Sequence, residues 1–470
     1  MSRPRVPQFH ATGRWWSSDE LASVAAGWRD VIDEQAGLDA VCAVAVPSTA
    51  DGLALFAAGS GRSSAVPVLA GDPEFWPDRT PLFDGMPLAL PPASAGLADE
   101  ARRRGFVPFV LGPSTGAVRT PFEPLRTPGF VIHTSGSTGA PKPVYRPTAH
   151  IIEGARVRAH ALGLRNGDGL VGGVPFSSGQ GVVQVVTAMV LQGALGMVGP
   201  VDYREVLTAL SLPQFACWRA TAHYADVLGR CALRSVPRAP RVCLISSPVG
   251  EPVHRAFVGR FGVPLRGAYS STETGAIAVD AAPDAEVQAG TVGRPLPGVD
   301  VAIGEHPHTP APAGTVGRVW VRSPWQMTGY GVPPRVERPD EVDGWWPTRD
   351  LGALDEAGRL RLAGRIDDCV RTREGRLVNL EAVAAALRNL RGVRAAVVLP
   401  LESAAGTSFG AVLQGEPGLS LDDLRRAAGT ALASWALPRA MHVVPELPRL
   451  PNGKPDRLAC MVLLAGGAAA

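Results

Sequence analysis

The stretch HTSGSTGAPKPVYRP, residues 133–147, is dominated by serine, threonine and glycine and carries a lysine at position 142. It continues the apolar run GFVIHTS (129–135), which predicts a buried strand. Glycine exposes backbone N–H groups, and with serine and threonine hydroxyls such a turn can bind an anion. A solvated linker is the other interpretation, but the strand before it and the Pro-Lys after it favour a phosphate loop. It is not a Walker A loop, because Gly139 lies three residues before Lys142 and Pro143 follows.

Lysine is very rare in this chain. Lys142 and Lys454 are the only lysines among 46 basic residues, and all the others are arginine. A flexible ammonium can reach a single oxygen in a way that a planar guanidinium cannot. Both lysines lie in turn-like segments that contain glycine, so we predict that the ammonium group itself is needed at both positions.

The composition is that of an ordinary globular protein. The chain has 470 residues, of which 46% are hydrophobic, and a formal net charge of +3. The length predicts more than one domain, and the balanced charge predicts neither a nucleic-acid partner nor an acidic membrane surface as partner. The six cysteines include no C-x-x-C pair, and the first residues lack an apolar secretory segment. We therefore expect reduced thiols in a cytoplasmic protein.

Residues 181–201 carry no charge and are long enough to cross a membrane. Two glutamines and several glycines interrupt the segment, and no cluster of Lys or Arg flanks it closely. We therefore predict a buried core helix over 181–201 and no membrane span.

Apolar runs alternate with helical patterns along most of the chain. This alternation predicts an α/β fold with mixed, mostly parallel sheets covered by helices. After Gly290 short glycine-punctuated β segments predict a small barrel or antiparallel subdomain, and after Gly364 a compact α+β unit follows. We place the domains at 1–363 and 364–470. Strands are expected at 40–47, 64–71, 105–112, 129–135, 169–175, 241–247 and 263–275, and a short helix at 51–60.

Five segments, in the same order as in one known family, carry a resemblance. They are HTSGSTGAPKPV, AYSSTETG (268–275), WWPTRDLG (345–352), GRIDDCVRTREGRLVNLEAV (364–383) and LPRLPNGKPDR (447–457). They resemble the adenylate-forming, AMP-binding superfamily of acyl- and aryl-CoA synthetases and nonribosomal-peptide adenylation domains. The resemblance implies an acetyl-CoA-synthetase-like fold, with a large adenylation domain and a small mobile C-terminal lid that carries the catalytic lysine.

The same resemblance implies an ATP and Mg²⁺ site. Tyr269 would stack on adenine, Thr272 would contact the α-phosphate and Glu273 would bind Mg²⁺. Asp350 and Arg365 would hold the ribose and phosphates, Asp367 would be the hinge, and Lys454 would bridge the carboxylate and the α-phosphate. The residues expected to hold the outer phosphates are Thr134, Ser135, Gly136, Ser137, Thr138, Gly139 and Lys142.

For the acid, the resemblance points to Ser178, Gly179, Ser246, Ser247 and Gly267. Ser178 stands where acyl-CoA synthetases usually have a histidine. Gly179 stands where amino-acid-activating relatives have an aspartate for the ammonium, so an α-amino acid is disfavoured. We expect a neutral acyl or aryl carboxylic acid, with an aromatic acid such as a hydroxybenzoate favoured.

The acyl acceptor is less defined. CoA, or the phosphopantetheine of an acyl or peptidyl carrier protein, is expected from the resemblance. Three positions depart from the family pattern: Glu374, Arg349 and Ser270 stand where relatives carry glycine. An amine or hydroxyl acceptor therefore stays open, and so does an inactive member that acts as a binding module.

Overall fold

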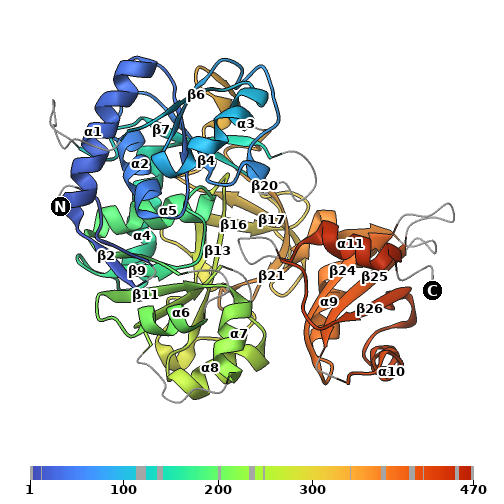
Figure 1. Ribbon diagram of the computed structural model, residues 1–470. Helices are drawn as coiled ribbons and strands as arrows, with labels where there is room; N and C mark the ends of the chain where they lie inside the picture. Colours follow the sequence, from blue (N-terminus) through green and yellow to red (C-terminus); the bar gives the residue numbers. More distant parts are fainter. Residues whose placement is uncertain are drawn as a thin grey trace. The chain divides into compact units, whose positions relative to one another are not determined.

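The computed structural model divides into two compact units (Figure 1). The first unit comprises Met1–Val301, Val321–Trp346 and Gly358–Leu360, and the second comprises Ala302–Trp320, Pro347–Ala357 and Arg361–Ala470. The second unit thus takes two segments from before position 364, and the boundary predicted at 363/364 remains a prediction. The structure describes residues 4–11, 13–112, 123–134, 141–198, 203–231, 239–246, 249–338, 340–371, 377–401, 408–415, 418–449 and 455–466.

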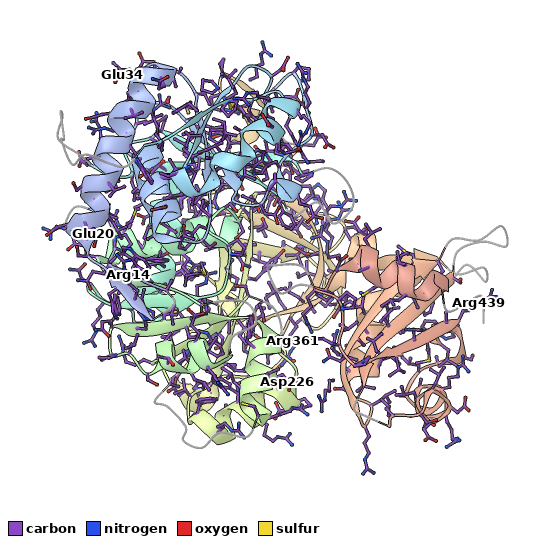
Figure 2. All side chains as sticks on the ribbon, viewed as in Figure 1. Arg14, Glu20, Glu34, Asp226, Arg361 and Arg439 are labelled. Atoms are coloured by element: carbon purple, nitrogen blue, oxygen red, sulfur yellow. The ribbon has the colours of Figure 1, made fainter. Side chains whose placement is uncertain are left out.

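An eight-stranded sheet forms one layer of the first unit. Its strands β7, β4, β3, β5 and β6 are parallel, whereas β8, β18 and β19 join antiparallel at one edge. Helix α2 is buried along almost its whole length, and α1 packs beside it with Glu20 and Glu34 exposed (Figure 2). The strands in sheet order are β19 (Arg335–Glu337), β18 (Gly329–Val332), β8 (Pro143–Pro147), β7 (Gly129–His133), β4 (Val66–Ala70), β3 (Ala43–Val46), β5 (Pro87–Leu90) and β6 (Val107–Val110), and the helices are α1 (Ser18–Ala36), α2 (Ala50–Ser60) and α3 (Ala98–Arg103).

A nine-stranded sheet forms the other layer of the first unit. The run from β13 through β12, β11, β9 and β10 to β1 is parallel, so the carboxyl ends of these strands meet at one edge. The strands in order are β15 (Arg294–Pro295), β14 (Gly275–Val279), β13 (Leu265–Ser271), β12 (Val242–Ile245), β11 (Phe215–Ala220), β9 (Gly169–Gly172), β10 (Leu195–Met197), β1 (Phe9–Ala11) and β2 (Arg14–Trp16); the helices are α4 (Thr148–Ala161), α5 (Gly179–Leu191), α6 (Tyr203–Leu210), α7 (Ala222–Arg230) and α8 (Glu251–Phe261).

The helix predicted over 181–201 is wrong in its second half. Helix α5 ends at Leu191, and the chain returns to the sheet as strand β10. Gln192 adopts a left-handed conformation, and a side chain at Gly193 would stand 2.0 Å from the carbonyl oxygen of Asp168. The close approach of Gly193 to that carbonyl therefore turns the chain into the sheet, which apolar composition could not show. Within the described residues, no helix is long and apolar enough to span a membrane.

The second unit contains the predicted α+β region and some of the β segments that follow Gly290, whereas β15, β18 and β19 belong to the sheets of the first unit. Strands β20 and β21 are neighbours in a four-stranded sheet. A core cluster centred on Leu387, Ala411 and Leu413 joins α9 to β25. The strands are β16 (Asp300–Ile303), β17 (Gly317–Arg322), β20 (Trp346–Leu354), β21 (Leu360–Arg365), β22 (Cys369–Arg371), β23 (Leu377–Asn379), β24 (Val393–Leu401), β25 (Ser408–Gly415) and β26 (Ala440–Val444), and the helices are α9 (Leu380–Arg388), α10 (Leu421–Ala431) and α11 (Arg457–Gly466).

Asn379 connects helix α9 to the end of β21. Its side-chain oxygen accepts from the N–H groups of Glu381 and Ala382 at 2.9 and 3.1 Å, and its amide donates to the Ala363 carbonyl at 2.5 Å. We expect Asn379→Ala to lower the free energy of unfolding by about 1–2 kcal/mol, because the helix loses its N-cap and a buried tether. Denaturant unfolding measures this loss.

Ser420→Ala is the matched control for that loss. Ser420 also caps a helix of the second unit, α10, but through one 3.5 Å contact to the N–H of Asp423. Its loss should be clearly smaller, and equal losses for the two variants would contradict a tethering role for Asn379.

Candidate active site

Two hydrogen bonds join Thr134 and Lys142, the residues at the two ends of the predicted phosphate loop. The N–H of Thr134 donates to the Lys142 carbonyl, and the N–H of Lys142 donates to the Thr134 hydroxyl, each at 3.0 Å. These bonds continue the antiparallel pairing of β7 with β8, in which His133 faces Pro143. Thr134 and Lys142 therefore close the base of the predicted phosphate loop, while Ser135, Gly136, Ser137, Thr138 and Gly139 lie outside the described residues.

Tyr330 interacts with both Lys142 and Glu273. The Lys142 ammonium is 5.3 Å from the centre of the Tyr330 ring, and the tyrosine hydroxyl donates to Glu273 Oε1 at 3.4 Å. The pairing of β18 with β8 places Tyr330 opposite Val144, two residues after the lysine. Sequence reasoning missed Tyr330, and its segment gave no signal for this role, because only strand pairing brings it to the site.

The tight turn between β13 and β14 presents Thr272 and Glu273. The Ser271 hydroxyl accepts from the Thr274 N–H at 3.0 Å and lies 2.9 Å from its hydroxyl. Gly275 adopts φ +75°, and a side chain there would come within 2.6 Å of the Arg146 guanidinium. Glycine is thus required at this turn, which lies against the buried Arg146 guanidinium.

Glu273 also acts on the buried Arg146. Burial lowers the pKa of Arg146 to about 10, and the Glu273 charge opposes that shift. The Arg146 guanidinium donates to the Trp325 carbonyl at 2.9 Å. The carboxylate predicted to bind metal therefore acts electrostatically on a buried cation of β8.

The predicted acid-binding residues lie at the carboxyl edge of the nine-stranded sheet. A side chain at Gly179 would stand 3.1 Å from the Thr272 hydroxyl, so the start of α5 lies close to the predicted α-phosphate residue. The Ser178 hydroxyl caps α5: it accepts from the Gly181 N–H at 3.0 Å and donates to the Pro175 carbonyl at 2.8 Å. Its hydroxyl is thus already occupied, and polarity toward a substrate must come from other side chains.

Three further predicted residues lie in β13 or at the end of β12. Ser246 follows β12 and is partly buried, whereas Ser247 lies outside the described residues. Gly267 pairs with Ile245 in the sheet. A side chain on Gly267 would come within 2.1 Å of the Thr291 carbonyl oxygen, so close packing explains the glycine at this position. Tyr269 is 7% exposed. The substrate and adenine roles of these residues remain predictions.

An ion-pair cluster of the second unit joins the predicted ribose and hinge residues. Arg365 lies 3.9 Å from the Asp350 carboxylate and 3.4 Å from that of Asp367. Arg349 also pairs with Asp367, and Arg457 of α11 pairs with Asp368 at 2.8 Å. In the sequence Arg349 stands out only because relatives carry glycine there, whereas in the structure it pairs with the predicted hinge residue Asp367. Lys454 lies outside the described residues, between Arg449 and Pro455, which form a β-bridge.

A cavity of about 620 Å³ lies elsewhere in the first unit, lined by residues that include Glu123, His150, Arg156 and Trp325. It contains none of the predicted site residues. The candidate site therefore follows from side-chain placement at the sheet edge and not from this cavity.

Comparison with known proteins identifies the family of the chain. The profile of the family described as "AMP-binding enzyme" matches residues 88–331, just over half of the chain. A sulfoacetate–CoA ligase of Cupriavidus necator is 28% identical over 370 residues, which cover 74% of this chain and 69% of that protein. An anthranilate–CoA ligase of Pseudomonas aeruginosa is 27% identical over 340 residues, covering 69% of this chain and 65% of that protein. The chain thus spans about two thirds of their length.

Solved structures support the fold. ATP-bound MatB of Rhodopseudomonas palustris superposes with a TM-score of 0.82 at 20% identity and covers 98% of this chain and 96% of its own. The chain therefore belongs to the AMP-binding enzyme family, the class of AMP-forming acid–thiol ligases expected from the sequence motifs. The predicted α/β fold with a large N-terminal and a smaller C-terminal part is confirmed.

His133 is the last residue of β7, directly before Thr134. Burial lowers its pKa from 6.5 to about 4, and its Nε2 has no partner among the described residues. Between pH 6.5 and 4 the unfolded chain binds a proton that the folded one does not, so stability is full above pH 6.5 and falls on acidification. We expect this residue to account for about 2–3 kcal/mol of the loss at pH 4.5.

His133→Phe should remove that contribution, so its free energy of unfolding at pH 4.5 should lie closer to the pH 7 value than in the wild type. Denaturant titrations at the two pH values measure this difference. His306→Phe, a change at an exposed position, is the control and should keep the wild-type dependence. An unchanged pH dependence in His133→Phe would refute the assignment.

Proposed function

We propose that the protein activates a small carboxylic acid with ATP as an acyl-adenylate, releases pyrophosphate, and transfers the acyl group to the thiol of CoA. The observation that carries the proposal is the closeness of Gly179 to Thr272, since a side chain on Gly179 would stand 3.1 Å from the Thr272 hydroxyl. It joins the position expected for the acid to the position expected for the α-phosphate. Family membership supports the same reaction class. We further propose a cytoplasmic location, from the six free cysteines.

The carboxylate of Glu273 and the ammonium of Lys142 have the chemistry needed to bind MgATP. Mg²⁺ prefers hard oxygen ligands and commonly uses one or two carboxylates together with substrate phosphates. Glu273 supplies one such carboxylate, and among the described residues no group of three or more His, Cys, Asp or Glu is arranged to hold a metal. A metal bound there would neutralise phosphate charge. We assign Tyr330 to orienting Glu273 and Lys142 to the outer phosphates.

The chemistry demands that two anions approach each other. A carboxylate oxygen attacks the α-phosphorus, the bond to the bridging oxygen breaks, and pyrophosphate leaves. Fixed positive groups lower this barrier most when they are preorganised around the developing charge. We propose Thr272 as a donor to the α-phosphate, Lys454 as the bridge between carboxylate and α-phosphate, Asp350 and Arg365 as ribose ligands, and Asp367 as the hinge.

Lys454→Ala should lower acid-dependent ATP–pyrophosphate exchange by at least about 100-fold and leave ATP binding largely intact, because the lysine acts on the transition state. Exchange kinetics and equilibrium binding of ATP measure the two effects. Arg439→Ala, which removes an exposed cation of the second unit (Figure 2), should leave both unchanged. Exchange at the wild-type rate in Lys454→Ala would overturn the mechanism.

The acceptor is tested by adding thiols to the preformed adenylate. We expect CoA, or a phosphopantetheine-bearing carrier protein, to yield a thioester faster than water hydrolyses the adenylate. Slow hydrolysis with both thiols, together with capture by an amine or hydroxyl compound, would favour the alternative ligase. The absence of pyrophosphate release with every acid would instead favour an inactive binding module.

A further inference from the structure

Arg219 is a buried cation at the carboxyl end of β11. Its side chain is on the α5 side of the sheet, and the residue is only 3% exposed. Its guanidinium makes two long contacts, to the Gln180 carbonyl at 3.2 Å and to the Ser246 hydroxyl at 3.5 Å, and its Nε has no partner among the described residues. A guanidinium has five N–H donors, so most of its hydrogen-bonding capacity is unused.

Two other buried arginines of the first unit are paired with carboxylates. Arg62 donates to Asp33 at 2.7 Å and to the Gly37 carbonyl at 2.6 Å, and Arg29 pairs with Asp30 at 2.6 Å. No carboxylate among the described residues pairs with Arg219. A buried charge without a counter-charge is destabilising, so its retention needs a reason.

Gln184 of α5 lies beside this arginine. It is 1% exposed, and both its amide nitrogen and its amide oxygen lack a partner among the described residues. A side chain on Gly172 would touch the Gln184 amide oxygen and the Arg219 Cβ, each at 3.3 Å. Glycine at 172 thus lets the two polar side chains approach, and the amide supplies a second set of unused donors.

A second buried arginine strengthens the positive field. Arg158 of α4 is 6% exposed, and its pKa is lowered to about 9, first by burial and then by the charge of Arg219. The other charges that act on it are Cys217 and Arg146, and no carboxylate is among them. Burial likewise lowers the pKa of Arg219. Two like charges are therefore held close together with no described anion between them.

We propose that Arg219, Gln184 and Ser246 form a receptor for a second anionic group on the acid, so that the substrate is a small dianionic acid, a dicarboxylate or a sulfonated carboxylate. The inference rests on the proposed function, since it specifies the acid that this site activates. A second anionic group on the acid would accept hydrogen bonds from the unused donors of Arg219 and Gln184 and would offset the positive charges of the two buried arginines. A dianionic substrate replaces the neutral acid expected from the sequence, and the positive charge of the receptor disfavours any substrate with an ammonium group.

The receptor lies close to the position of the reacting carboxylate. Gly179 lies close to Thr272, while the carbonyl of the next residue, Gln180, accepts from Arg219. The Thr272 hydroxyl and the Arg219 guanidinium are therefore separated by a distance on the order of 10 Å. This span suits short acids in which a few bonds separate the two anionic groups.

The test compares acids that differ only in the second charge. Malonate, succinate, sulfoacetate and isophthalate are assayed by ATP–pyrophosphate exchange, each dicarboxylate beside its monomethyl ester. We expect the wild type to prefer a diacid over its ester. Arg219→Met should lower kcat/KM for that diacid about 10- to 100-fold, mainly through KM, and spare the ester. Arg219→Lys should lose less, because it keeps the charge but not the planar fork.

Arg62→Met is the control for removing a buried arginine. It should lower stability but leave the diacid-to-ester ratio unchanged. Preference for the monoester in the wild type, or equal losses for both acids in Arg219→Met, would overturn the inference. If no acid supports exchange, the proposed function fails. Stabilisation by the diacids in thermal unfolding, present in the wild type and absent in Arg219→Met, then still tests the receptor, and no stabilisation in the wild type refutes it.

Discussion

The parallel register of β9, β11, β12 and β13 is the constraint on which the candidate site depends. Parallel strands end at the same edge of a sheet, so residues that follow them in distant parts of the sequence become neighbours. Arg219 and Ser246 meet in this way, and the β13–β14 turn brings Thr272 to the start of α5. A shift of one residue in any of these strands would turn its side chains to the opposite face.

The polar groups at this edge divide into two kinds. Tyr330 donates to Glu273 and its ring lies beside the Lys142 ammonium, and the Glu273 charge acts on the buried Arg146. Arg219 and Arg158, in contrast, are buried without a carboxylate partner among the described residues. Burial without compensation is tolerated where a ligand completes the pairing, so the same edge contains both the charges that serve the nucleotide and those that we assign to the acid.

Much of the fold was predictable because its signals are local. Buried strands such as β3 and β4 are short apolar runs, and they lie within the segments 40–47 and 64–71 that the sequence predicts as strands. The end of α5 was not predictable, because its cause is the close approach of Gly193 to the carbonyl of Asp168. That close approach involves the residues after α5 and the residue before β9, and the local composition of neither segment predicts it.

The family could be recognised from the sequence, and a phosphate loop could be predicted from it, because phosphate binding needs glycine, hydroxyl and lysine residues at fixed local spacing. The scarcity of lysine likewise predicts roles for Lys142 and Lys454. Only the tertiary structure decided that Tyr330 contacts Glu273, that Arg349 pairs with Asp367, and that Arg219 is buried without a carboxylate partner among the described residues. Each of these contacts depends on strand pairing or packing between segments that are distant in the sequence. Nothing in an arginine-rich sequence shows which arginines are buried.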